Sequence, residues 1–322
     1  MRLNDEVGEH MGALDGRTVA VTGAGRGIGR AVALLAAEEG ASVVVTDNGC
    51  EPDGTGGSHD FADATAEAIT TAGGKAVATY GDVASWEGGE ETIKAALDTY
   101  GTIDALVNCA GIVRDTPIWE MTEEDWDTVI RGNIKALFVP TKFAGIAMRQ
   151  QRYGRIVNMV SDAGLGAVGS TNYAAAGEGG VGFTRTSARD MGRYGVTTNG
   201  ISPLARTRLS GGLSEQLRPP AGIVSADEVA RIGAPDPTLQ WKGEGHADDP
   251  ASIAPLAVYL ASEAAGEVNG QFFGVRGGDI YLYSHPGIDR QILTYGRAFT
   301  LDELDEQMPR TLGLGIANPV NG

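Results

Sequence analysis

The 322-residue sequence is poor in the residues that build disulfide frameworks, metal centres and membrane spans. It has only two cysteines, Cys50 and Cys109, and four histidines that lie far apart along the chain. Two cysteines cannot form a disulfide framework, and the histidine spacing matches no metal-ligand pattern, so we expect no metal. No apolar run approaches the roughly 18 residues that a membrane-spanning helix needs. A disulfide scaffold, a metal site and a membrane-spanning protein are therefore not expected.

Positive charge is scarce as well. The 25 lysines and arginines face 42 aspartates and glutamates, which gives a formal charge of −17, and the basic residues form no cluster. Such a chain repels phosphate backbones and anionic lipids, so we expect neither nucleic acid nor a membrane as partner. The first ten residues include acids and lack a basic stretch before an apolar core, unlike a secretory signal. These features predict a soluble, cytoplasmic protein that acts on a small molecule.

Short β-branched runs alternate with amphipathic stretches from Thr18 onward. The runs lack the period-2 alternation of a half-buried strand, so each is expected to be apolar on both sides. This pattern predicts an α/β fold: a single domain with a doubly wound (Rossmann), mostly parallel, seven-stranded sheet. The expected strands are residues 18–22, 42–46, 76–80, 105–108, 155–159, 197–201 and 272–275, and the expected helices include 31–39, 62–72, 90–100, 123–149 and 172–191.

Three segments fall outside this alternation. Residues 1–13 are expected to form a loose N-terminal arm before a domain over 14–280. Residues 48–60 form a Gly/Asp-rich insertion after the second strand that is too polar to pack. The proline-containing stretch 209–249 fits either a mobile lid over a substrate pocket or a plain surface excursion. Residues 281–322 are a C-terminal extension with one expected helix, at 300–308, and no catalytic role.

A glycine-rich turn joins the first strand to the first helix. It reads Thr22-Gly23-Ala24-Gly25-Arg26-Gly27-Ile28-Gly29. Glycines permit a tight turn whose backbone N–H groups point outward, and the following helix N-terminus adds partial positive charge. A pyrophosphate fits such a turn, although similar turns also serve as plain connectors.

Asp47 ends the second strand, 20 residues after Gly27. A carboxylate there can accept hydrogen bonds from a ribose and repel a 2′-phosphate, which favours NAD over NADP. Two observations keep alternatives open. Asp47 precedes Asn48-Gly49 and could simply form a turn, and Arg26 could attract a 2′-phosphate.

The glycine spacing is T-G-x-x-x-G-x-G, and with the motifs that follow it the chain resembles the short-chain dehydrogenase/reductase family over residues 14–278. Asn108-Cys109-Ala110-Gly111 resembles the family's N-N-A-G motif, with cysteine in place of the second asparagine. The resemblance implies that Asn133, Ser161 and Tyr173 are the catalytic residues. The glycine turn, Asp47 and the family motifs together predict the cofactor-binding residues. They are Thr22, Gly23, Arg26, Gly27, Ile28, Gly29, Asp47, Asp82, Val83, Asn108, Ala110, Gly111, Pro203 and Thr207.

Within the family, the chain looks most like the hydroxyacyl-CoA dehydrogenase domains of the peroxisomal multifunctional (type 2) enzymes and their bacterial relatives. This resemblance implies hydride transfer between NAD(H) and a secondary alcohol or ketone, with 3-hydroxyacyl thioesters, cyclic or steroid-like ketones and small ketones all open as substrates. Tyr173 would act as acid/base while Ser161 holds the same oxygen near the nicotinamide. The family also implies a homotetramer or dimer packed through residues 123–149 and 172–191.

One expected residue is missing. The family has a lysine four residues after the catalytic tyrosine, where its charge lowers the tyrosine pKa and its ammonium holds the nicotinamide ribose. That position is Gly177, and no lysine occurs between Lys142 and Lys242. Three hypotheses follow: a dehydrogenase in which another group replaces the lysine, an altered copy of an active enzyme, or a cofactor-binding but catalytically impaired subunit that pairs with an active homologue.

Overall fold

The computed structural model describes residues 12–209, 249–294 and 296–315. The chain divides into two units, the first ending at Tyr283 and the second running from Ser284 to Gly322. The expected arm at 1–13 and the expected lid or excursion at 209–249 lie almost entirely outside the described residues. Within the described ranges, no helix is long and apolar enough to cross a membrane.

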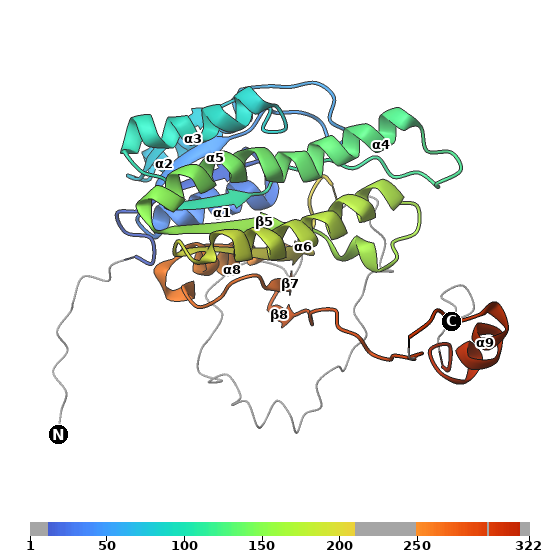
Figure 1. Cartoon of the computed structure of the whole chain (residues 1–322). Coiled ribbons are helices and arrows are strands. Elements are labelled where there is room, and N and C mark those ends of the chain that lie inside the picture. Colours follow the sequence, from blue (N-terminus) through green and yellow to red (C-terminus); the bar gives the residue numbers. More distant parts are fainter. Residues whose placement is uncertain (1–11, 210–248, 295, 316–322) are drawn as a thin grey trace, which may run out of the picture. The chain divides into compact units, whose positions relative to one another are not determined.

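The first unit is built on one eight-stranded sheet with the order β3-β2-β1-β4-β5-β6-β7-β8 (Figure 1). The strand order reverses between β1 and β4, and in doubly wound sheets ligands bind at the carboxyl ends of the strands beside such a reversal. All neighbours are parallel except β7 and β8. The strands are β1 Thr18–Thr22, β2 Ser42–Thr46, β3 Lys75–Thr79, β4 Ala105–Asn108, β5 Gly154–Met159, β6 Val196–Pro203, β7 Phe272–Arg276 and β8 Asp279–Leu282.

The expectation of seven strands was wrong by one, because β8 adds an antiparallel edge strand. A Gly277-Gly278 turn joins it to β7, and this dipeptide is a hairpin signal that the sequence interpretation took for the end of the domain. The four residues of β8 are mostly exposed, so this strand lacks the buried apolar side chains of the central strands. Gly274 makes the pairing possible, since a Cβ there would lie 2.1 Å from the Tyr281 ring.

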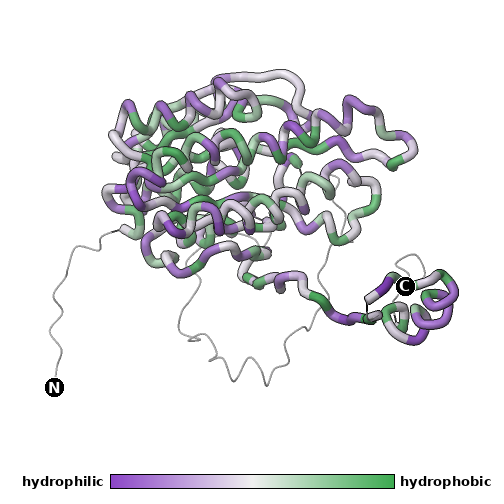
Figure 2. The backbone as a smooth tube through the Cα atoms, in the orientation of Figure 1, coloured by the Kyte–Doolittle hydropathy of each residue, from purple (hydrophilic) through white to green (hydrophobic). Residues whose placement is uncertain are grey.

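Helices cover both faces of the sheet (Figure 1). Alternate residues of each strand face opposite layers: Val19 and Val21 pack with α1 and α8, while Ala20 packs with α3 and α5. Hydrophobic residues accordingly gather between the layers (Figure 2), which confirms the parallel, doubly covered sheet. The α-helices are α1 Gly27–Glu38, α2 Asp60–Thr71, α3 Trp86–Tyr100, α4 Glu123–Ile130, α5 Ala136–Gln151, α6 Thr171–Gly192, α8 Ala254–Ala261 and α9 Leu301–Gln307.

The single helix expected over 123–149 is interrupted. A π-helical turn, Arg131–Lys135, separates α4 from α5. Inserted π turns often occur at functional sites because they redirect side chains and carbonyls locally. Asn133 lies in the middle of this turn, and a hydrophobic period cannot reveal such an interruption.

The second unit contains the helix that the sequence predicts over residues 300–308. Thr300 accepts a hydrogen bond from the Glu303 N–H, and the Glu303 carboxylate accepts one from the Thr300 N–H, which makes a capping box before α9. An ion pair with Arg297 and the Thr300 N–H lower the pKa of Glu303 to about 2. The expected helix at 300–308 is therefore confirmed.

Candidate active site

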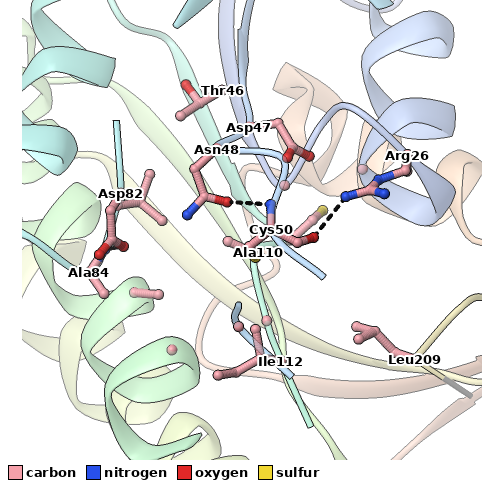
Figure 3. Close-up of a pocket in the computed structure, with 18 of the residues that line it drawn as sticks. Arg26, Thr46, Asp47, Asn48, Cys50, Asp82, Ala84, Ala110, Ile112 and Leu209 are labelled. Atoms are coloured by element: carbon pink, nitrogen blue, oxygen red, sulfur yellow. Dashed lines mark hydrogen bonds between the residues drawn. The ribbon is translucent and has the colours of Figure 1, made fainter. Parts of the chain in front are cut away.

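A cavity of about 370 Å³ lies at the carboxyl ends of β1, β2 and β4, and the glycine turn forms one of its walls (Figure 3). Gly23 and Gly27 adopt φ angles of +62° and +55°, which favour glycine. A Cβ on Gly29 would lie 2.1 Å from the Gly23 carbonyl oxygen, so only glycine allows this approach. Because α1 begins at Gly27 without a side-chain cap, its first N–H groups remain available for a phosphate. A dinucleotide fits these features.

Asp47 lines the cavity and is only 8% exposed. One carboxylate oxygen accepts a hydrogen bond from the Gly25 N–H at 2.8 Å, and the other accepts one from the Gly49 N–H at 2.7 Å. The turn-forming role that we held open is therefore real. Each carboxylate oxygen has a second lone pair, so Asp47 can also accept a ribose hydroxyl.

Two arginines meet at the edge of this cavity. The Arg26 guanidinium lies 3.6 Å from the centre of the Phe61 ring and donates to the Cys50 carbonyl oxygen at 2.8 Å (Figure 3). Arg208 donates to the same oxygen at 2.6 Å and lies 4.0 Å from the Glu51 carboxylate. Burial and the Arg208 charge lower the pKa of Arg26. The sequence interpretation missed Arg208. Its contacts join the segment after β6 to the loop after β2.

The insertion after β2 packs against the rest of the unit, so the expectation that residues 48–60 are too polar to pack was wrong. The Val113 N–H donates to the Pro52 carbonyl at 2.9 Å, and the Arg114 Nε donates to the Asp53 carbonyl at 2.8 Å. Backbone hydrogen bonds satisfy the polar segment without apolar burial, which composition does not reveal. The insertion thereby becomes a wall of the cavity.

Most of the expected cofactor residues line this cavity, and three, Thr22, Asn108 and Pro203, do not. The lining residues of the expected set are Gly23, Arg26, Gly27, Ile28, Gly29, Asp47, Asp82, Val83, Ala110, Gly111 and Thr207. The Thr22 hydroxyl accepts the N–H groups of the two residues after Asn108, whose own amide donates to Asn158 at 2.9 Å. Pro203 ends β6. The cavity wall also includes residues that the sequence did not point to, among them Cys50, Cys109, Ile112, Arg131, Arg208 and Leu209.

Cys109, which replaces the second asparagine of the family's motif, is not a reactive thiol. Burial raises the pKa of its thiol to about 12, so it stays protonated at neutral pH. The substitution therefore adds no chemistry of its own to the cavity.

A second, smaller cavity of about 20 Å³ shares Ala110 with the first. Asn133, Ser161 and Tyr173 all line it, together with Gly177. Ser161 follows β5, and Tyr173 lies in the first turn of α6. The fold thus brings together the three residues that the sequence proposed as catalytic, beside the dinucleotide cavity.

The surroundings of Tyr173 disfavour its ionised form. Burial raises the pKa of Tyr173, a hydrogen bond between the Ser161 and Tyr173 side chains lowers it in part, and the charges of Asp115 and Asp162 raise it further. Among the described residues, none of the groups that shift this pKa is a cation. Tyr173 is therefore a neutral phenol at neutral pH, able to donate a proton but not to accept one.

Gly177 is buried against Ser161, in the segment that follows β5. A Cβ built there would lie 2.9 Å from the Ser161 carbonyl oxygen and 3.1 Å from the Ser161 Cβ. A lysine would require the helix or the serine to shift, so the missing side chain is part of how α6 packs. The neighbouring Glu178 is exposed and does not point into the cavity.

The Asn133 side chain is occupied by backbone groups. Its amide nitrogen donates to the carbonyls of Ile112 and Val129 at 2.9 Å and 2.8 Å, and its oxygen accepts the Ile112 N–H at 3.3 Å. It fastens the segment after β4 to the π turn. In this structure the Asn133 side chain positions the site and leaves no amide hydrogen for a substrate.

Comparisons with known proteins agree with this geometry. The family model described as short chain dehydrogenase matches residues 17–217. The chain is 37% identical over 300 residues to hydroxyacyl-CoA dehydrogenase ChsB1 of Mycobacterium tuberculosis, covering 90% of this chain and 87% of that protein. It is 38% identical over 265 residues to the mouse peroxisomal multifunctional enzyme type 2, covering 82% of this chain but only 32% of that longer protein.

Among solved structures, a short chain dehydrogenase from Mycobacterium avium superposes with a TM-score of 0.78 at 39% identity, covering 96% of this chain and 98% of that one. The family match covers more than half of the chain, and the α/β fold agrees with it. The chain belongs to the short-chain dehydrogenase family and is an oxidoreductase by that membership.

Proposed function

We propose that this protein transfers a hydride between NAD(H) and a secondary alcohol or ketone. The observation that carries the proposal is the small cavity that holds Ser161 and Tyr173 together and shares Ala110 with the dinucleotide cavity. A carbonyl carbon bound there would lie beside a nicotinamide ring, which supplies or accepts the hydride when bound.

The chain's own residues handle the oxygen of the substrate. The Ser161 hydroxyl orients it, and the Tyr173 hydroxyl donates a proton to it as the carbonyl is reduced. Since burial and two carboxylates keep Tyr173 neutral, the proton needed for reduction is already present. We therefore propose ketone reduction as the favoured direction.

NAD is the proposed cofactor, in preference to NADP. Asp47 places a negative charge on the cavity wall, where it repels a 2′-phosphate and can accept a ribose hydroxyl. Arg26, the group that could attract a 2′-phosphate, is engaged by the Cys50 carbonyl and the Phe61 ring. These contacts support NAD.

The substrate is proposed to be a secondary alcohol or ketone of the kinds that the relatives suggest, namely a 3-hydroxyacyl thioester or a cyclic or steroid-like ketone. One relative is named for hydroxyacyl-CoA. We also propose a cytoplasmic homo-oligomer, a dimer or tetramer, packed through α4, α5 and α6, as the family resemblance implies.

One observation favours a second candidate, a cofactor-binding subunit with impaired catalysis. Gly177 excludes the lysine sterically, and the described charges near Tyr173 are both negative. Such a subunit would bind NADH through the intact glycine turn yet turn over slowly, alone or beside an active homologue.

Binding and turnover measured separately test both candidates. The purified protein is titrated with NADH and NADPH by nicotinamide fluorescence, and then assayed by nicotinamide absorbance with ketone and 3-oxoacyl substrates. We expect NADH to bind at least about tenfold more tightly than NADPH, and Asp47→Asn to narrow that ratio. Asp53→Asn is the matched control, since Asp53 caps its own turn through Thr55 without lining the cavity.

Each outcome is informative. Turnover with NADH supports the reductase, and binding without turnover on any substrate supports the impaired subunit. Failure to bind either cofactor would contradict both candidates.

A further inference from the structure

Two segments frame the small cavity and carry exposed apolar side chains. The first, residues 112–122, follows Ala110 and presents Ile118 and Trp119, which are 63% and 80% exposed. The second, residues 162–170, runs from Ser161 to the helix that carries Tyr173. It presents Leu165 and Val168, 73% and 93% exposed. The first segment begins two residues after Ala110 and the second directly after Ser161, so both leave the wall of the cavity.

Hydrogen bonds hold the two segments together. The Ser170 hydroxyl donates to Asp115 at 2.8 Å, and the Asn172 amide donates to the Arg114 carbonyl at 3.0 Å. They therefore form one surface beside the catalytic residues. Exposed apolar groups gathered at a cavity commonly mark a site for an apolar ligand.

The charges on this surface are mainly negative. Asp115 and Asp162 are the charged groups that act on Tyr173. The guanidinium of Arg114 is engaged by Glu124 and Asp125 at 3.4 Å and 3.5 Å, and by the insertion after β2.

Neighbouring segments do not reverse this sign. Arg276 faces Asp279 across the β7–β8 pair.

A coenzyme A thioester carries a 3′-phosphate and a pyrophosphate outside the reacting group. Proteins recognise such phosphates with arginine and lysine, whose charge and hydrogen bonds complement them. Carboxylates beside the path of such a carrier repel its phosphates. From the apolar rim and the excess of acids we propose that the substrate of this site is an uncharged, apolar ketone or its alcohol, and not a thioester of coenzyme A or another polyanionic carrier. This inference rests on the proposed function.

The test compares one acyl group on two carriers. Reduction by NADH of a 3-oxoacyl-CoA, the same 3-oxoacyl group on uncharged N-acetylcysteamine and an apolar cyclic ketone is measured at low and high ionic strength. We expect kcat/KM at least about tenfold higher for the uncharged thioester than for the CoA thioester, with only the CoA value rising with salt. A preference for the CoA thioester that weakens with salt would overturn the inference.

Variants identify the surface responsible. Asp115→Asn is expected to raise the ratio of CoA to N-acetylcysteamine activity several-fold, while Glu38→Gln, an exposed residue on α1, leaves that ratio unchanged. Val168→Ser is expected to raise KM for the cyclic ketone, whereas Leu301→Ser, also exposed but on α9, has no such effect. An unchanged ratio in Asp115→Asn together with an unchanged KM in Val168→Ser would overturn the assignment.

A binding measurement separates this inference from the proposed function. Calorimetric titration of the protein saturated with NADH is performed with both thioesters. If no compound is turned over, the proposed reductase fails, yet tighter binding of the uncharged thioester still supports the apolar substrate site. Tighter binding of the CoA thioester overturns it.

Discussion

The dinucleotide cavity and the catalytic cavity meet at Ala110 but differ in what builds them. The first depends on backbone geometry: a glycine turn, a helix N-terminus and a carboxylate held by two N–H groups. The second depends on the charge around one phenol, and there the family's lysine is replaced by Gly177. We therefore expect cofactor binding and proton transfer to respond separately to substitutions in the two cavities.

Removing the phenol of Tyr173 should have the largest effect on the difference between the two cavities. Tyr173→Phe deletes the proposed proton donor but leaves the larger cavity intact, because Tyr173 does not line it. We expect ketone reduction to fall by about 10³-fold while the dissociation constant for NADH stays within about twofold. Stopped-flow reduction and fluorescence titration measure the two quantities. Retained reduction would mean that another group supplies the proton.

The dependence on pH sharpens the contrast. Burial and the charges of Asp115 and Asp162 raise the pKa of Tyr173, so the phenol is protonated below that pKa and ionised only above it. Ketone reduction should therefore be flat from about pH 6 to 9, whereas alcohol oxidation should still be rising at about pH 10, the ordinary tyrosine pKa. Asp162→Asn removes one negative charge and should move the oxidation profile to lower pH. A plateau in oxidation near neutral pH would reveal a cation that acts on Tyr173.

Substitutions at two glycines of α6 test whether packing excludes a lysine at position 177. A Cβ at Gly177 meets Ser161 at 2.9 Å, but one at Gly182 meets nothing within 4 Å. Alanine in place of a helical glycine gains about 1 kcal/mol in propensity, so Gly182→Ala should stabilise the protein by about that amount. Gly177→Ala should instead destabilise it by about 1–3 kcal/mol and lower turnover several-fold. Urea denaturation and initial rates measure these effects.

Gly177→Lys adds charge to the same clash. We expect the turnover of Gly177→Lys to be no higher than that of Gly177→Ala, since Ser161 must move in both variants. Turnover well above that of the parent protein would show that charge alone was missing and that the packing is adaptable.

The smallest expected effect concerns the edge of the dinucleotide cavity. Arg208→Ala removes the hydrogen bond to the Cys50 carbonyl and the ion pair with Glu51. NADH should dissociate a few-fold faster, as measured by stopped-flow displacement, because an exposed ion pair contributes about 1 kcal/mol or less. Arg189→Ala, on an exposed turn of α6, is the control. Equal dissociation rates would mean that Arg208 does not retain the cofactor.

Sequence reasoning reached the parallel sheet and the glycine turn because each has a local signature, and it reached the three residues of the small cavity through the family resemblance. Buried parallel strands are continuous apolar runs in the sequence, and in this type of fold the glycine turn follows the first strand. It missed β8, the π turn and the packing of the insertion. Their determinants are hydrogen bonds to distant segments, such as Val113 to Pro52, and these leave no periodic pattern.

The sequence by itself determined the fold class, the glycine turn and the absence of the family's lysine, since all three follow from residue types at fixed spacing along one strand, turn or helix. Only the tertiary structure decided that Gly177 packs against Ser161, that Arg26 and Arg208 share the Cys50 carbonyl, and that two carboxylates act on Tyr173. Those contacts join residues far apart in the chain, and their energies depend on distance and burial, which exist only after the chain has folded.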